Sequence, residues 1–237
     1  MLRPGEVALD RIGSRHDGRP YVVAQLGVSL DGRIATRNGD SRGLGGSPSL
    51  DHLHALRARV DAVLVGIGTV LADDPRLNVR RCAGSSPARV VLDARGALPA
   101  SARCLEGGDG ARRIVFRGAD RGGGDLPSGV EIVPLPAPEG RFDMTRVMEM
   151  LAEFGFGTVL IEGGAGIVSQ AIDTGLVDRL HLMVSPVILG SGRNGLDLSP
   201  IEQIRDARRP PTDVIPLGDG DVLFDCDMTA EEPRRSP

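Results

Sequence analysis

The stretch that decides the fold is Thr158-Val-Leu-Ile-Glu-Gly-Gly-Ala-Gly-Ile-Val-Ser-Gln-Ala171. It begins with an apolar run long enough for a buried strand, passes through Glu162 and two glycines, and continues as an apolar-periodic segment to Gly175. This order predicts a strand, a glycine turn and a helix. Such glycines let a phosphate approach the backbone N–H groups at a helix N-terminus, where the helix dipole favours negative charge. Taken alone, the stretch also fits a turn whose glycines serve only close packing.

A second junction of this kind occurs earlier in the chain. The apolar run 62–66 leads into Gly66-Ile-Gly68-Thr69, and a short helical segment follows before Asp73, Asp74 and Pro75. Two such turns on one sheet indicate a site for the two ends of an extended anionic ligand. The aspartates precede a proline in a loop that can present carboxylates outward, although an Asx-type turn accounts for Asp74 equally well.

The rest of the chain alternates between apolar runs and helical patterns. Strands are predicted at 21–28, 88–93, 113–117, 130–135 and 177–184, helices at 47–59 and 143–154, and a hairpin at 211–228. This order predicts one α/β domain with a mostly parallel sheet and an antiparallel edge. The glycine-rich loop 38–47 is either a lid or a plain linker.

The ends and faces of the two helices can also be predicted. Ser47 is expected to cap the first helix, with Pro48 at its first position and with Leu50 and Leu53 facing inward. Asp143 is expected to cap the second helix, whose apolar stripe repeats at helical spacing.

Composition excludes several classes of function. The chain has 237 residues, 41% of them hydrophobic and 25% charged, with no tryptophan, one tyrosine and five phenylalanines. So few aromatic residues do not favour a surface built on base or sugar stacking. The formal net charge of −4 argues against a nucleic-acid or membrane partner.

Cysteine and histidine usage predicts no metal site. Cys82, Cys104 and Cys226 are widely spaced and form no C-x-x-C pair. His52 and His54 point to different sides of a helix, so surface or packing roles are expected for them. The N-terminus lacks an apolar signal region, and we expect a reduced, cytoplasmic protein.

Several motifs occur together in one order. They are Ser29-Leu-Asp-Gly-Arg-Ile-Ala35, Gly39-Asp-Ser41, His54-x-Leu-Arg57, Asp61-x-x-Leu-Val-Gly-x-Gly-Thr69-Val-Leu-Ala-Asp73-Asp-Pro-x-Leu77-x-Val-Arg80, Val90-Val-Leu-Asp93 and Glu162-Gly-Gly164. In these motifs the chain resembles the reductase domain of riboflavin biosynthesis, over roughly residues 20–228. The resemblance implies a dihydrofolate-reductase-like three-layer α/β/α fold, NADPH as cofactor, and a homodimer. The polar, Gly- and Arg-rich segment 1–19 is expected to form a flexible arm, and the charged segment 229–237 a disordered tail.

The family reduces a ribosylaminopyrimidine 5′-phosphate at C1′ to the ribitylamino compound, and the resemblance assigns residues to that reaction. It implies catalytic roles for Asp73 and Glu162. Cofactor contacts are implied for Gly27, Gly43, Thr69, Asp73, Gly164, Ala165, Gly166, Ile167, Val168, Ser169 and Gln170. Substrate contacts are implied for Ser41, Arg57, Leu77, Arg80 and Glu162, with Arg57 and Arg80 as a phosphate clamp. Arg95 is a further candidate for the 2′-phosphate of NADPH.

Two departures from the family pattern leave the substrate open. Gln25 stands where the family usually has lysine, and Ser41-Arg-Gly43-Leu-Gly45 replaces a segment that contains tryptophan. One alternative is therefore a reductase of another pterin- or pyrimidine-like substrate such as dihydrofolate, and another is a non-catalytic nucleotide-binding module. No H-x-E and no Pro-Cys-x-x-Cys occurs, so we expect no deaminase activity.

Overall fold

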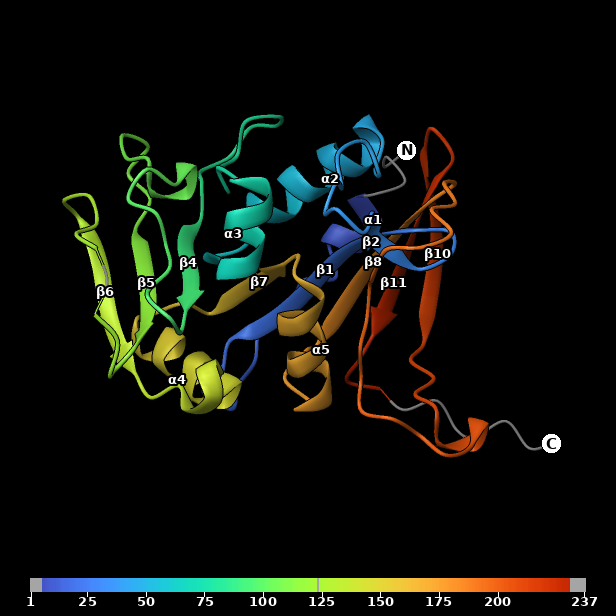
Figure 1. The fold of residues 1–237 in the computed structure, drawn as a ribbon. Helices are drawn as coiled ribbons and strands as arrows, with labels where there is room; N and C mark the ends of the chain where they lie inside the picture. Colours follow the sequence, from blue (N-terminus) through green and yellow to red (C-terminus); the bar gives the residue numbers. More distant parts are fainter. Residues whose placement is uncertain (1–5, 123, 231–237) are drawn as a thin grey trace.

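A nine-stranded sheet forms the centre of the molecule (Figure 1). The computed structural model describes residues 6–122 and 124–230. The strand order is β10-β11-β8-β1-β7-β3-β4-β5-β6, with all neighbours from β8 to β6 parallel and with β11 and β10 antiparallel. The bounds are β1 Tyr21–Ser29, β3 Ala62–Gly66, β4 Ala88–Asp93, β5 Arg113–Gly118, β6 Val130–Leu135, β7 Thr158–Glu162, β8 Arg179–Ser185, β10 Thr212–Gly218 and β11 Asp221–Asp227. The predicted parallel sheet and terminal hairpin are confirmed.

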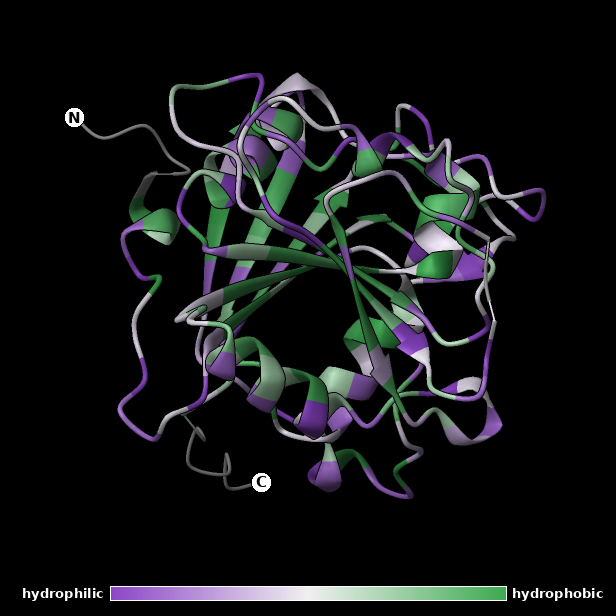
Figure 2. Cartoon of the chain, turned by 90° about the vertical axis from the view of Figure 1, so that its left-hand side faces the viewer, coloured by the Kyte–Doolittle hydropathy of each residue, from purple (hydrophilic) through white to green (hydrophobic). Residues whose placement is uncertain are grey.

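Helices cover both faces of this sheet, because each central strand alternates apolar side chains between them. On one face, Val22 and Ala24 of β1 share a core with α4 (Met144–Glu153) and α5 (Ala165–Asp173). On the other, Val23 packs with residues of α2 (Ser47–Arg57) and α3 (Ile67–Asp73). Figure 2 shows the hydrophobic strands between these helices. The predicted three-layer α/β/α architecture is confirmed.

Helix α4 begins as the sequence predicts. The Asp143 carboxylate accepts hydrogen bonds from the backbone N–H groups of Thr145, at 2.8 Å, and Arg146. Gly155 follows the helix with φ of +88°, a conformation that suits glycine. The prediction of Asp143 as the cap is therefore confirmed.

Helix α2 begins differently from the prediction. Gly46 is its N-cap, and Ser47 is the first helical residue, so the expectation of a Ser47 cap is wrong. Asp221, at the start of β11, accepts hydrogen bonds from the Gly46 N–H at 2.7 Å and the Ser49 hydroxyl at 2.5 Å. A buried carboxylate from the far end of the chain thus supplies the acceptor and the negative charge that a helix N-terminus favours.

The buried face of α2 is also more polar than predicted. Leu50 is exposed, whereas Ser49 and His52 are buried, so the inward placement of Leu50 is wrong. The reason is that strands β8 and β11 offer these polar side chains partners in Asp221 and His181. Polar groups are stable inside a protein where such partners satisfy them.

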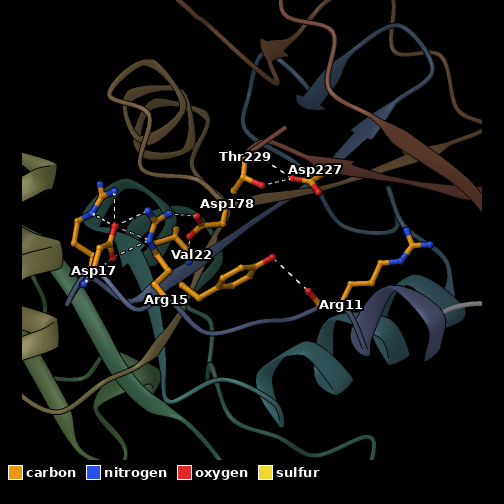
Figure 3. Close-up of polar contacts among 9 residues, drawn as sticks. Arg11, Arg15, Asp17, Val22, Asp178, Asp227 and Thr229 are labelled. Atoms are coloured by element: carbon orange, nitrogen blue, oxygen red, sulfur yellow. Dashed lines mark hydrogen bonds and ion pairs between the residues drawn. The ribbon is translucent and has the colours of Figure 1, made fainter. Parts of the chain in front are cut away.

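The described part of the N-terminal segment packs on the domain rather than forming a free arm. In α1 (Glu6–Leu9), Ala8 and Leu9 are buried. Arg15 pairs with Asp17 and with Asp178, and Asp178 also accepts the Val22 N–H at 2.8 Å (Figure 3). These contacts tie residues of the segment to β1, while residues 1–5 of the expected arm lie outside the described residues.

The C-terminal end of the described chain is also fixed by local contacts. The Thr229 N–H and hydroxyl both donate to Asp227, at 3.0 and 2.7 Å (Figure 3). Residues 231–237 of the expected tail lie outside the described residues. Within residues 6–122 and 124–230, no helix is long and apolar enough to cross a membrane.

Candidate functional site

A cavity of about 1160 Å³ opens where the central parallel strands end. Open α/β sheets bind ligands at the carboxyl ends of their strands, and this cavity lies beside the ends of β1, β3, β4 and β7. Its lining includes predicted site residues from five separate segments: Gly27, Ser41, Thr69, Asp73, Leu77, Glu162, Gly164, Ala165, Gly166, Ile167, Ser169 and Gln170. Pockets for a single small molecule are usually smaller, so this one has room for a dinucleotide and a second ligand.

The turn between β7 and α5 forms a cradle in one wall of the cavity. Gly163 and Gly164 have φ of +56° and +75°. A Cβ atom on Gly164 would lie 2.9 Å from the Thr69 hydroxyl, so the turn approaches α3 too closely for a larger residue. No side chain caps α5, and among the described residues the N–H groups of Ala165 and Gly166 have no acceptor. These groups are available to an anion at the helix N-terminus.

A buried ion pair fixes the position of Glu162 at the end of β7. The guanidinium of Arg57 donates from Nε to Oε1 at 2.5 Å and from Nη2 to Oε2 at 2.6 Å, and its Nη1 donates to the Asn78 carbonyl at 3.0 Å. Arg57 is 5% exposed and Glu162 6% exposed. Burial lowers the pKa of Arg57, but the charge and hydrogen bonds of Glu162 outweigh this and raise it overall. The two side chains hold one another in a single geometry.

This geometry differs from the phosphate clamp predicted from Arg57 and Arg80. All three nitrogens of Arg57 face protein acceptors, so its guanidinium has no free fork for a phosphate in this structure. Arg80 is exposed, does not line the cavity, and donates to the Asn78 side chain at 3.0 Å. The two arginines therefore do not converge on one anion here.

Four other predicted contacts also have different surroundings. Val168 is fully buried in the core with α4, and neither it nor Gly43 lines the cavity. The Ser169 hydroxyl accepts the Asp197 N–H at 2.9 Å, and the Gln170 amide donates to the Phe142 carbonyl at 2.9 Å. The side chains of Ser169 and Gln170 thus anchor α5 to neighbouring loops.

The loop that follows β2 (Arg33–Ala35) forms part of the cavity wall. Ser41 donates to Asp73 at 3.0 Å, which joins this loop to the end of α3. Strand β2 pairs with β9 (Arg193–Asn194) in a separate two-stranded sheet, and residues of both strands line the cavity. The structure therefore gives the loop a place at the site, as the lid interpretation requires.

The backbone beside Asp73 is strained. Asp74 and Leu77 have φ of +41° and +57°. Leu77 is fully buried in the core on the sheet face that α2 and α3 cover. Each left-handed conformation costs a non-glycine residue about 1–2 kcal/mol. Such strain is found at functional sites where packing over-determines the backbone, which matches the position of Leu77 in the cavity lining.

Sequence reasoning missed several lining residues. Ser49 and Leu53 of α2, Phe142 before α4, and Arg193 and Asn194 of β9 all line the cavity. Phe142 contributes an aromatic side chain to the lining. No spacing rule links β9 to β2, because about 160 residues separate them, so only the folded chain brings them together.

A buried histidine pair lies under α2. His52 Nε2 is 3.1 Å from His181 Nδ1, and His181 Nε2 is 3.2 Å from an Asp225 carboxylate oxygen. Burial, followed by the neighbouring His181, lowers the pKa of His52 to about 3. The packing role expected for His52 is consistent with its 4% exposure.

This burial predicts a loss of stability on acidification. Between pH 6.5 and pH 3 the unfolded chain holds a proton on His52 that the folded chain lacks. The free energy of unfolding must therefore decrease as the pH is lowered through this range. At pH 5 the loss from His52 alone is about 2 kcal/mol relative to pH 7. Urea unfolding at pH 5 and at pH 7 measures this loss of stability. His52→Leu should reduce the difference between them, and His16→Gln, at an exposed position, should not. An unchanged difference in His52→Leu would contradict the assignment.

The model of the RibD C-terminal domain matches residues 20–213. This chain belongs to that family. The 2,5-diamino-6-ribosylamino-4(3H)-pyrimidinone 5′-phosphate reductase of Methanothermobacter thermautotrophicus is 35% identical over 201 residues, which are 81% of this chain and 90% of the relative. The protein of that name from Archaeoglobus fulgidus is 32% identical, covering 73% of this chain and 83% of its own length.

Other members of the RibD C-terminal domain family are longer. Riboflavin biosynthesis protein RibD of Actinobacillus pleuropneumoniae is 28% identical, and the match covers 87% of this chain but 56% of that protein. The Thermotoga maritima deaminase/5-amino-6-(5-phosphoribosylamino)uracil reductase has a TM-score of 0.75 and 29% identity, over 88% of this chain and 56% of that one. The chain thus spans a little over half the length of these RibD proteins. The riboflavin biosynthesis reductase Rib7 of Saccharomyces cerevisiae shares the fold, with a TM-score of 0.72 at 23% identity over 91% of this chain and 92% of that one.

Proposed function

We propose that this protein is an NADPH-dependent reductase that converts a ribosylaminopyrimidine 5′-phosphate to its ribitylamino product. The observation that carries the proposal is one cavity with two chemically different walls. One wall is the glycine cradle at α5, and the other is formed by Glu162, which Arg57 holds, together with Gln25. The names of the archaeal relatives, which cover most of this chain, support the same reaction.

The cradle suits the diphosphate of a dinucleotide. The uncapped N-terminus of α5 offers N–H groups and a favourable dipole, and Thr69 lies against the same turn. Arg95 and Arg141 line the cavity beyond the end of β4 and form no ion pair with another described residue. Their charge is suited to the 2′-phosphate that distinguishes NADPH from NADH. Bound NADPH would supply the hydride for C1′.

The protein's own residues would position the substrate. Arg57 holds the Glu162 carboxylate at the cavity wall, where it can accept hydrogen bonds from the substrate through its remaining lone pairs. Ser41 and Asp73, joined by a hydrogen bond, and the strained Leu77 also line the cavity. We assign the substrate phosphate to Arg80, an exposed residue beside Asn78 outside the cavity lining, and a positioning role to Arg57.

Assembly as a cytoplasmic homodimer is part of the proposal. The edge strand β10 exposes Val214, and the free hydrogen-bonding edge of such a strand can pair with a second copy. Sedimentation or light scattering of the purified chain would test for the dimer.

A direct assay tests the proposed reaction. NADPH binding is measured by titration, and its oxidation is then followed with the 2,5-diaminopyrimidinone phosphate, the 5-aminouracil phosphate or dihydrofolate as acceptor. We expect turnover of at least one ribosylaminopyrimidine phosphate and none of dihydrofolate. Turnover of dihydrofolate alone would point to a related reductase, binding without turnover to a non-catalytic module, and absence of NADPH binding would contradict the proposal.

A further inference from the structure

A buried carboxylate from the C-terminal hairpin joins the cavity loop to α2. Asp221, the first residue of β11, is 3% exposed and lies outside the cavity lining. Its Oδ2 atom accepts hydrogen bonds from both the Gly46 N–H, at 2.7 Å, and the Ser49 hydroxyl, at 2.5 Å. Among the described residues it forms no ion pair, so neutral donors and the positive end of the α2 dipole compensate its charge. The contacts of Asp221 are thus confined to the junction between loop 38–46 and α2.

The turn between β10 and β11 packs closely on the same junction. A Cβ atom on Gly46 would lie 3.2 Å from the Asp219 Cβ and 3.3 Å from Asp221 Oδ2. On the other side of the contact, a Cβ on Gly218 would lie 3.1 Å from the Pro48 ring. Packing of this density leaves few alternative positions. The end of the loop and the first turn of α2 are therefore fixed by the hairpin.

The segment 41–46 of the loop lies between two anchors of different strength. At one end the Ser41 hydroxyl donates to Asp73, which is exposed, at 3.0 Å. Among the described residues this is the only hydrogen bond from residues 41–45 to a residue outside the loop. Water competes for a bond at the surface, so it stabilises less than the buried bonds to Asp221. Three residues of the segment line the cavity: Ser41, Leu44 and Gly45. Their position therefore depends mainly on the Asp221 end.

Helix α2 extends this dependence to the rest of the site. Ser49, Leu50 and Leu53 of the helix line the cavity. Its last residue, Arg57, holds Glu162 through the hydrogen bonds of 2.5 and 2.6 Å. The backbone bonds of a helix are internal, so a shift of its first turn is transmitted along its length. Asp221 thus fixes both chain segments that surround this part of the cavity.

We propose that Asp221 is a positioning residue for the pyrimidine phosphate, a role that rests on the proposed reductase function. It holds the junction at Gly46, and the loop and α2 then present their lining residues to the substrate without any contact between Asp221 and the ligand. The cofactor cradle is formed by the turn before α5 and by Thr69 of α3, and Asp221 contacts neither. Loss of Asp221 therefore weakens binding of the pyrimidine phosphate and leaves NADPH binding unchanged.

Asp221→Ala tests this role, because it removes the acceptor of both hydrogen bonds. A misplacement of about 1 Å in a binding group can cost 100-fold, so KM for the pyrimidine phosphate should rise about 10-fold to 100-fold. The Kd for NADPH should change less than about twofold. Asp221→Asn keeps an oxygen that can accept both bonds and should hold KM within about threefold of the unaltered protein. Ser49→Ala removes one donor and suits a helix, so it provides the test if Asp221→Ala does not fold, with a rise in KM of about threefold to 10-fold.

Cleavage of the loop by trypsin gives a readout that does not depend on turnover. Arg42 is exposed within the segment, and a protease cuts faster where the chain opens more often. Cleavage after Arg42, followed by mass spectrometry, should be about 10-fold faster in Asp221→Ala. Asp61→Ala is the matched control. Asp61 accepts three hydrogen bonds of 2.8 to 2.9 Å from Gly157 and Thr158 at the amino ends of β3 and β7, so its loss should lower stability without changing either readout.

The outcomes separate the inference from the function on which it rests. A selective rise in the pyrimidine KM together with faster cleavage after Arg42, both absent in Asp61→Ala, supports it. An unchanged pyrimidine KM in Asp221→Ala or Ser49→Ala, equal losses for NADPH and the pyrimidine, or the same changes in Asp61→Ala overturn the inference and leave the reductase function standing. If the unaltered protein binds NADPH but reduces neither pyrimidine phosphate, the proposed function fails and the inference with it.

Discussion

Replacing Arg57 with methionine is expected to stop turnover and to destabilise the protein. The substitution leaves the Glu162 carboxylate buried without its partner, and removing one member of a buried ion pair costs about 3–5 kcal/mol. It also removes the donor to the Asn78 carbonyl. Since the carboxylate would no longer be held at the cavity wall, kcat/KM for the pyrimidine phosphate should fall about 100-fold or more. Urea unfolding and steady-state kinetics measure the two effects.

A double variant separates stability from function. In Arg57→Met with Glu162→Leu, both charges are gone, and replacing a buried pair by apolar residues is often neutral for stability. We therefore expect the double variant to regain most of the lost stability and to remain inactive, while still binding NADPH. An active double variant would show that Glu162 has no part in the reaction. A stable and active Arg57→Met would show that the pair is not needed at all.

Much of the fold could be predicted because its signals are local. The central strands of the parallel sheet contain apolar runs, and a glycine turn marks the start of α5 within the same short stretch as β7. Asp143 caps α4 from the position directly before the helix, so the residue type at that position was enough to predict the cap. The positions of Glu162 and Gly164 in the cavity also follow from their place at the end of a strand.

The features that the sequence did not reveal depend on contacts between distant segments. Asp221 supplies the cap of α2 from about 175 residues away, so Ser47 was assigned a role that another residue performs. From the sequence, Arg57 is predicted to bind a phosphate. In the structure it pairs with Glu162 instead, because α2 packs beside β7. The N-terminal segment is polar, yet Arg15 finds Asp178 only once β8 is in place. Pairings of this kind have no period or spacing to reveal them.

Gly164→Ala is expected to weaken NADPH binding strongly at modest cost to stability. An added Cβ would lie 2.9 Å from the Thr69 hydroxyl and would displace the turn whose N–H groups form the cradle. Alanine also resists φ of +75° by about 1 kcal/mol. A misplacement of about 1 Å in a binding group can cost 100-fold, so the Kd for NADPH should rise between about 10-fold and 100-fold.

Gly175→Ala provides the matched control for this prediction. Gly175 follows α5 with φ of +68°, and nothing lies within 4 Å of an added Cβ. The two variants should therefore lose similar stability in urea, because both place alanine in the left-handed region, while only Gly164→Ala loses affinity for NADPH. Equal Kd values in the two variants would mean that backbone strain alone was measured and that the turn does not hold the cofactor. A loss confined to Gly164→Ala would instead identify the close contact between this turn and α3 as the feature that shapes the phosphate cradle.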